Sequence, residues 1–354
     1  MTHKFDYNWT LKDAVFTKDK GKVFSCFACG GGSTMGYKLA GFDVVGHNDI
    51  DPKMIEVYKE NHKPKYSFLE SITTFAKRKD LPKELYELDI LDGSPPCSSF
   101  SMAGNREKDW GKEKVFREGQ AEQVLDTLFF DFIDLAKELQ PKVVIAENVK
   151  GLLLGEAKKY VIKIYEAFDK AGYTCQHFLL NASKMGVPQR RERVFFIALR
   201  KDLAPKFMEN VDMFTKLPKI ELEFNEKDIV YSKIETKEKG KPVLKKIQEV
   251  FNEILPGEQC GNFFRRTIGK ETMFSYNKAH PEQVIPTITA GDSGTFHYNK
   301  PYYLSNNELI SAGSFPKDYN FLKLNPKYLI GMSVPPIMTA QISSNIYKQW
   351  LSKL

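Results

Sequence analysis

Short apolar runs typical of buried strands alternate with helical segments through the first 200 residues, and this alternation limits the fold most strongly. An amphipathic helix is indicated where Phe129, Phe132 and Leu139 recur at helical spacing. A second helix is expected from Pro52, a residue favoured at the first helical position. Such alternation predicts a doubly wound α/β sheet. The expected strands lie near residues 23–26, 42–46, 88–91, 143–146, 174–180 and 194–199.

The pattern changes after residue 199, where the chain becomes rich in lysine and weakly periodic up to about residue 261. From about residue 325 it is apolar and helical again. We therefore expect one domain over residues 1–200, completed by residues 320–354, and a smaller domain over residues 201–319.

Composition narrows the class of protein. The 354 residues carry a net charge of +7, which suits a polyanionic partner without identifying one. No apolar run approaches the roughly 20 residues of a membrane span, and the N-terminus does not resemble a signal peptide, so we expect a cytoplasmic protein. Cys26 and Cys29 form a lone C-x-x-C without a second pair of ligands, so no metal site is expected.

The turn after the first expected strand contains Gly30-Gly31-Gly32, which would let a ligand approach the backbone at a helix N-terminus. It does not match the G-x-G-x-x-G fingerprint of dinucleotide sites. After the second strand, Asp51 precedes Pro52 and is expected to cap a helix, which leaves Asp49 for ribose hydroxyls and Ile50 for an adenine face. These features favour S-adenosylmethionine over a nicotinamide cofactor.

Two reactive side chains follow expected strands, at the sheet edge where open α/β folds place their chemistry. Cys97 follows Pro95-Pro96, and Glu147 follows the run at residues 143–146. An isolated cysteine is more often simply buried, but a neighbouring carboxyl group changes that balance. Burial is expected to favour the protonated form of Glu147.

This pair suits methylation of cytosine. Addition of a thiolate at C6 makes C5 nucleophilic, and a neutral Glu147 would assist by hydrogen bonding N3. Negative charge that develops on O2 could be held by Arg191 or Arg193, in the run Gln189-Arg190-Arg191-Glu192-Arg193. Without the other features, those arginines read as solvated or paired with Glu192.

Six blocks in order resemble the DNA (cytosine-5)-methyltransferases of bacteria and phages, over nearly the whole chain. They are residues 24–32, residues 93–104 with Pro95-Pro96-Cys97, Glu147-Asn148-Val149, residues 189–193, Thr287-Ile288-Thr289, and residues 331–334. The resemblance implies a Rossmann-like class I S-adenosylmethionine-dependent methyltransferase sheet with a smaller target-recognition domain. It also implies a loop after Cys97 that closes over DNA, and a target cytosine flipped out of the duplex.

The resemblance assigns residues to three groups. Cys97 is the nucleophile, Glu147 the partner of N3, Asn148 its support and Arg193 the contact to O2, with Arg191 as a second arginine. The cofactor group is Phe27, Ala28, Gly30, Gly32, Asp49, Ile50, Glu70, Ser71, Ile72, Ser94, Pro95 and Ser333. The DNA group is Ser99, Ser101, Arg265, Arg266, Lys278, His280, Thr289 and Asp292.

Three positions depart from the family pattern. Asp49 stands where a glutamate is usual, and Glu70 or Ser71 stands where an aspartate usually meets the adenine. Met332 replaces the asparagine of Gly-Asn-Ser-Val, although Ser333 remains.

The resemblance implies a monomer that acts on double-stranded DNA in restriction-modification or phage DNA protection, with any cognate restriction endonuclease acting separately. A related tRNA cytosine-5 methyltransferase would show Cys-Phe-Thr soon after Glu-Asn-Val, but this chain has Lys150-Gly151-Leu152 there. A non-catalytic DNA-binding subunit is disfavoured by the presence of Cys97, Glu147 and Arg193. A nicotinamide oxidoreductase is disfavoured by the missing dinucleotide fingerprint.

Overall fold

The structure is a computed structural model that describes residues 3–96, 113–114, 123–124, 127–208, 217–270, 272–273, 275–291 and 294–354. The chain forms two compact units. The first, here called the sheet unit, comprises Val15–Leu180, Glu192–Glu223 and Ile342–Leu354. The second unit comprises Met1–Ala14, Asn181–Arg191 and Phe224–Gln341.

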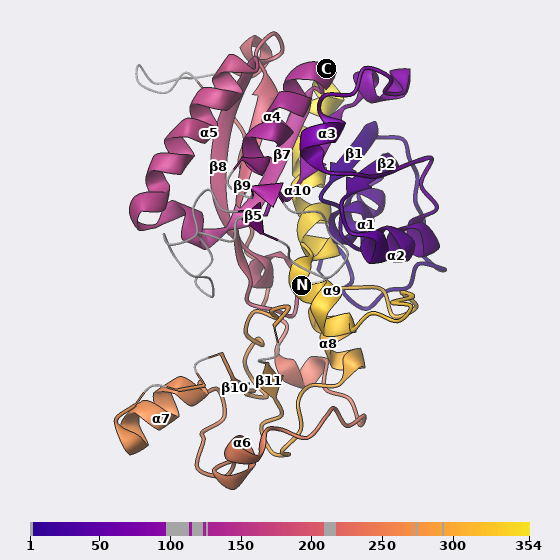
Figure 1. Cartoon of the computed structure of the whole chain (residues 1–354). Coiled ribbons are helices and arrows are strands. Elements are labelled where there is room, and N and C mark those ends of the chain that lie inside the picture. The colour runs from indigo at the N-terminus through magenta and orange to yellow at the C-terminus, as the bar shows by residue number, and fades with distance from the viewer. Residues whose placement is uncertain are drawn as a thin grey trace. The chain divides into compact units, whose positions relative to one another are not determined.

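A seven-stranded sheet with the order β3-β2-β1-β4-β7-β9-β8 forms the centre of the sheet unit (Figure 1). The pairs β1–β2, β2–β3, β1–β4 and β4–β7 are parallel, whereas β7 and β9 are antiparallel. The expected α/β sheet is thus confirmed. Its strands are β1 (Lys22–Cys26), β2 (Asp43–Asp49), β3 (Tyr66–Leu69), β4 (Ile90–Gly93), β7 (Val143–Val149), β8 (Tyr173–Asn181) and β9 (Glu192–Arg200).

Helices cover both faces of this sheet. On one face, α3 (Ile72–Phe75), α4 (Leu128–Leu139) and α5 (Lys158–Lys170) bury their apolar residues against alternate side chains of β1, β4, β7 and β9. Figure 1 shows α4 and α5 beside β7, β8 and β9. Near β1 and β2 lie α1 (Gly32–Leu39) and α2 (Pro52–His62). Tyr37 of α1 reaches Asp92 of β4.

Local sequence signals explain several of these boundaries. The Asp51 side chain accepts hydrogen bonds from the backbone N–H groups of Lys53 and Met54, which confirms it as the cap of α2. Gly93 ends β4 where an added Cβ would lie 2.5 Å from the ring of Phe132 in α4. This close approach of the helix to the strand requires glycine at that point.

The second unit holds shorter elements around its own apolar cluster, which contains Ile247, Phe263 and Phe296. Its helices are α6 (Lys245–Glu249), α7 (Cys260–Ile268), α8 (Asn306–Ala312) and α9 (Pro326–Met332), while α10 (Pro336–Gln349) runs from this unit into the sheet unit. Its two strands, β10 (Asn277–Lys278) and β11 (Thr295–Phe296), are parallel.

The remaining elements are short. β5 (Glu113–Lys114) pairs antiparallel with β6 (Gln123–Val124). The 3-10 helices are η1 (Lys83–Glu87), η2 (Lys150–Leu153), η3 (Gly155–Ala157), η4 (Ala182–Met185), η5 (Ala204–Phe207), η6 (Tyr231–Lys233) and η7 (Leu351–Lys353). Within the described ranges, no helix is both long and apolar enough to cross a membrane.

Candidate active site

The Gly-rich turn after β1 has an unusual backbone. Phe27, Cys29 and Gly31 have φ angles of 51°, 50° and 84°, and the first two are residues that rarely adopt the left-handed region. A Cβ on Gly31 would lie 2.2 Å from Nε2 of His62. The turn is therefore held in a costly conformation, as often seen where a backbone contacts a ligand.

Asp49, at the end of β2, faces this turn. Its carboxylate accepts the N–H of Cys29 at 2.7 Å and the N–H of Asp51 at 2.9 Å. Burial raises the pKa of Asp49 to about 6, and these backbone donors oppose the shift. The carboxylate thus fixes the turn in place, and Phe27, Ala28, Gly30 and Gly32 lie in or beside it. Ile50 follows Asp49 and is half-buried.

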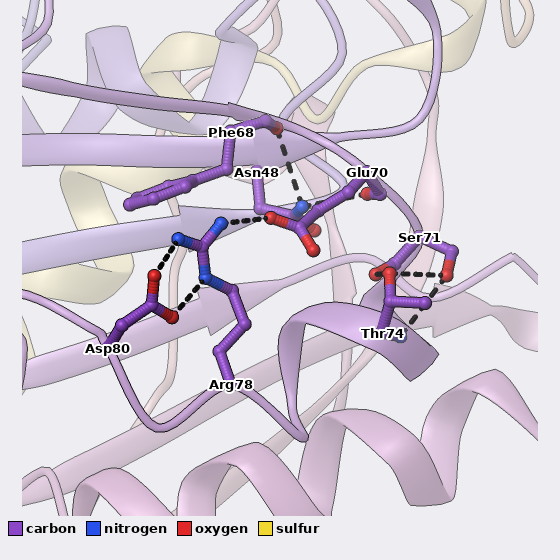
Figure 2. Close-up of polar contacts among 7 residues, drawn as sticks. All are labelled: Asn48, Phe68, Glu70, Ser71, Thr74, Arg78 and Asp80. Atoms are coloured by element: carbon purple, nitrogen blue, oxygen red, sulfur yellow. Dashed lines mark hydrogen bonds and ion pairs between the residues drawn. The ribbon is translucent and has the colours of Figure 1, made fainter.

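The segment after β3 contains Glu70 and Ser71, which stand where the family pattern has an aspartate that meets the adenine (Figure 2). The Glu70 carboxylate accepts a hydrogen bond from Arg78 at 2.8 Å, and Arg78 also binds Asp80 through two nitrogens. The Ser71 hydroxyl accepts the N–H of Thr74 and so caps α3. Both polar side chains are therefore engaged within the protein. Ile72 is buried in the sheet unit, and Asn48 donates to the backbone oxygens of Phe68 and Glu70.

Beneath the Gly-rich turn, Asp92 of β4 is 4% exposed and accepts hydrogen bonds from Ser25 at 2.8 Å and Tyr37 at 3.0 Å. Burial raises the pKa of Asp92 to about 7, against the effect of these two hydroxyl donors. This buried carboxyl group of β4 thus connects to β1 and α1 through its hydrogen bonds, two residues before Ser94. The sequence prediction did not include Asp92.

The end of β7 is tied to the turn that follows β4. Nδ2 of Asn148 donates to the carbonyl of Pro95 at 3.2 Å, and Oδ1 of Asn148 accepts the N–H of Val149. Asn148 is 3% exposed, so this is a fixed internal contact. It holds the Ser94-Pro95-Pro96 turn against β7. Cys97, Ser99 and Ser101 lie outside the described residues.

Glu147 and Arg193 form a largely buried charge pair between β7 and β9. Nε of Arg193 lies 2.9 Å from Oε1 of Glu147, and their side chains are only 15% and 12% exposed. The register explains the contact: Glu147 lies opposite Phe195 and Val149 lies opposite Arg193, so the two are diagonal neighbours on one face of the sheet. Burial lowers the pKa of Arg193, and the Glu147 carboxylate opposes that shift.

Arg191 lies in a different environment from Arg193. Its guanidinium, in a residue 3% exposed, donates to the carbonyls of Ile288 and Gly331 at 3.0 Å each. Gln189 similarly accepts the N–H of Ile288 and donates to the carbonyl of Ala312. Arg191 thus joins distant segments of the second unit, whereas Arg193 pairs with Glu147.

The segments around Thr289 and Ser333 are closely packed. A Cβ on Gly331 would lie 2.4 Å from the backbone nitrogen of Ala290, so only glycine permits this approach. Ser333 is 4% exposed and donates to the carbonyl of Leu329, whereas Met332 is 45% exposed. Thr289 itself is exposed.

The residues expected to contact DNA are not equivalent in the structure. Lys278 is 4% exposed, and its ammonium donates to the carbonyls of Phe251 and Ile254 and lies over the Phe251 ring, so it stabilises the unit from within.

Arg265 and Arg266 lie on the exposed face of α7, where Arg266 binds Glu258 through two nitrogens. His280 accepts the N–H of Glu282, and Asp292 lies outside the described residues.

Among the described residues, no group of three or more histidine, cysteine, aspartate or glutamate side chains is placed to hold a metal ion. Cys26 and Cys175 are buried thiols, and burial raises the pKa of each. Cys29, the other member of the C-x-x-C, contacts the sulfur of Met54.

Comparison with known proteins identifies the family. The model of the C-5 cytosine-specific DNA methylases matches residues 21–348. The chain belongs to this family. Its members use S-adenosyl-L-methionine as methyl donor, and the fold is that of the class I methyltransferases.

Individual relatives agree with this assignment. The chain is 36% identical to the Type II methyltransferase M.FnuDI of Fusobacterium nucleatum over 182 residues, which cover 51% of this chain and 48% of that protein. It is 28% identical to the Type II methyltransferase M1.HphI of Haemophilus parahaemolyticus over 334 residues, or 91% and 85% of the two chains. The match to M.FnuDI thus spans about half of that protein's length.

Among solved structures, the S. pombe Dnmt2 methyltransferase superposes with a TM-score of 0.60 at 17% identity, covering 92% of this chain and 97% of that one. This likeness shows the fold.

Proposed function

We propose that the chain transfers a methyl group from S-adenosyl-L-methionine to C5 of a cytosine in duplex DNA. The observation that carries the proposal is the Glu147–Arg193 pair near the end of β7. The residue after Glu147, Asn148, holds the turn that leads to Cys97. A carboxyl group, a guanidinium and a tethered turn at one sheet edge suit attack on a ring that gains negative charge at O2.

The cofactor is assigned to the Gly-rich turn and the ends of β2, β3 and β4. The donor set fits a nucleoside: the left-handed backbone at Phe27, Cys29 and Gly31 brings main-chain atoms toward a ligand, and the Asp49 carboxylate can accept hydroxyl protons. To bind the ligand through Oε1, Glu70 would have to give up its ion pair with Arg78. When bound, S-adenosyl-L-methionine supplies an electrophilic methyl group.

The target cytosine is assigned to Cys97, Glu147 and Arg193. The Cys97 thiolate would add to C6, and the electrons of the C5–C6 double bond would make C5 nucleophilic. Protonated Glu147 would donate a hydrogen bond to N3, and Arg193 would stabilise the negative charge on O2. C5 would then take the methyl group. Loss of the C5 proton to solvent and departure of the Cys97 thiolate from C6 would restore the aromatic ring. Arg191 has a structural part, through its two carbonyl contacts.

The site can hold this chemistry only if the base leaves the stack, because C6 is unreachable within a duplex. M.FnuDI and M1.HphI are both Type II methyltransferases, which suggests a restriction-modification setting. We extend that setting to this chain, with a monomer acting on DNA and any cognate endonuclease acting separately. Exposed Arg265, Arg266 and Thr289 are the DNA contacts that this proposal keeps.

The test is the Cys97→Ala variant, assayed for methyl transfer to duplex DNA and for duplex binding. We expect transfer to be abolished and binding to be largely retained, because the thiolate acts only in the chemical step. Cys175→Ala is the matched control, since Cys175 is a buried thiol of the sheet unit with no assigned part in the reaction. Turnover by Cys97→Ala at the rate of the Cys175→Ala control would overturn the mechanism.

A further inference from the structure

The second unit contains a cavity of about 630 Å³ that none of the assigned residues occupies. Its lining includes Lys239, Lys241, Lys323 and Lys327, with Glu238 as the one acidic residue among the described residues that line it. Two segments far apart in sequence supply these lysines, so the fold gathers positive charge here.

The charges of this cavity are largely uncompensated within the protein. In the described part of the chain, Lys239, Lys241 and Lys323 form no ion pair, and all three side chains are exposed. Lys239 lies 5.6 Å from the centre of the Tyr302 ring, and Lys327 donates to the carbonyl of Gly291. Elsewhere in the same unit, Lys184 pairs with Asp228 and Lys278 satisfies buried carbonyls.

The cavity wall also leaves room for a ligand. A Cβ placed on Gly291 would have no described atom within 4 Å, and one on Gly294 would first meet the flexible Lys327 side chain at 3.3 Å. Backbone at these two positions is therefore accessible from the cavity. Thr295, Asn306 and Asn325 add polar side chains to a lining that also contains Tyr303, Leu304, Leu309 and Leu324.

We propose that this lysine cavity binds phosphates of the DNA backbone, an inference that rests on the proposed action on duplex DNA. Lys239, Lys241 and Lys323 form no ion pair in the described part of the chain, so their charges attract an anion and gain by releasing the counterions of a polyanion. Lysine is a compact charge that positions phosphate without reading a base. The cavity lies in the unit that also carries exposed Arg265 and Thr289, so one unit would combine backbone positioning with base contacts.

The test compares two variants of the full chain that lose the same charge. Lys239→Gln/Lys241→Gln removes two lysines of the cavity, and Lys163→Gln/Lys170→Gln removes two exposed lysines of α5 in the sheet unit. Binding to unmethylated duplex DNA is measured between about 50 and about 200 mM salt. Each lost phosphate contact should reduce the slope of log K against log[salt] by about 0.9.

We expect the cavity variant to lose one or two contacts. Over that fourfold increase in salt concentration, the loss of affinity of the cavity variant would then be about 3- to 12-fold smaller than that of the wild type. The α5 variant should keep the wild-type slope and the wild-type rate of methyl transfer at saturating DNA.

A wild-type slope in the cavity variant, or an equal change in both variants, would overturn the assignment. A slope change with tRNA but not with duplex DNA would also overturn it. Absence of methyl transfer to any DNA, with the slope change intact, would instead count against the proposed function alone.

Discussion

The ion pair between Glu147 and Arg193 gives the sharpest quantitative prediction. We consider Glu147→Gln, Arg193→Gln and the double variant. At 2.9 Å, the two charges attract each other by about 6 kcal/mol at an effective dielectric constant of about 20. Most of this is offset by desolvation, since both side chains are at least 85% covered by protein.

Each single change should lower the free energy of unfolding by about 3 kcal/mol, because it leaves a covered charge without its partner. The double variant should lose about 4 kcal/mol rather than 6, which corresponds to a coupling energy of about 2 kcal/mol. The measurement is urea denaturation of the four proteins without cofactor or DNA. Lys79–Glu138, with Lys79 75% exposed, is the control pair, and its coupling should stay below about 0.5 kcal/mol.

The same variants test the chemistry. Glu147→Gln should lower the single-turnover rate of methyl transfer by at least about 100-fold, as expected for loss of a positioned proton donor. Coupling no larger than that of the control pair would refute the structural reasoning. A wild-type rate in Glu147→Gln would remove Glu147 from its assigned part at N3.

Other consequences follow from single sites. Arg191→Lys should lower the free energy of unfolding by about 2 kcal/mol, because two carbonyls lose their donor, without changing the rate of methyl transfer by the folded protein. Arg193→Lys should instead lower the rate of methyl transfer. Equal rates in the two variants would contradict this division of roles. Since the pKa of Asp92 is raised to about 7 in the folded state, Asp92 contributes stability below about pH 4 that is lost as the pH rises through about 7. The free energy of unfolding of Asp92→Asn, measured in urea, should therefore increase relative to that of the wild type between about pH 5 and about pH 8. Parallel pH profiles of the two proteins would refute this. Gly31→Ala should weaken S-adenosyl-L-methionine binding in calorimetry, because its Cβ would collide with His62 at 2.2 Å in a left-handed turn, and wild-type affinity would show that the turn can adjust.

The sequence predicted most of the sheet because its central strands are buried and consequently apolar. The expected helix through Phe129, Phe132 and Leu139 coincides with α4, and Asp51 caps α2 as its place before Pro52 indicated. β3 and α3 were missed, since β3 is only half-buried and four residues long, which leaves too little pattern to detect.

The side-chain contacts of the site depend on register and distance, which one sequence does not show. Arg191 and Arg193 are two residues apart and looked equivalent, yet only Arg193 lies in β9, diagonal to Glu147. Lys278 looked like a surface charge, but the carbonyls of Phe251 and Ile254 bind its ammonium inside the unit. Asp92 went unnoticed because its importance comes from Ser25 and Tyr37, which are distant in sequence.

The central claim is best tested by incubating the protein with S-adenosyl-L-methionine that carries a labelled methyl group, with unmethylated duplex DNA and bulk tRNA in parallel. The account predicts label on DNA as 5-methylcytosine, at positions that would define the target sequence. Label on tRNA alone, or on neither nucleic acid, would contradict it.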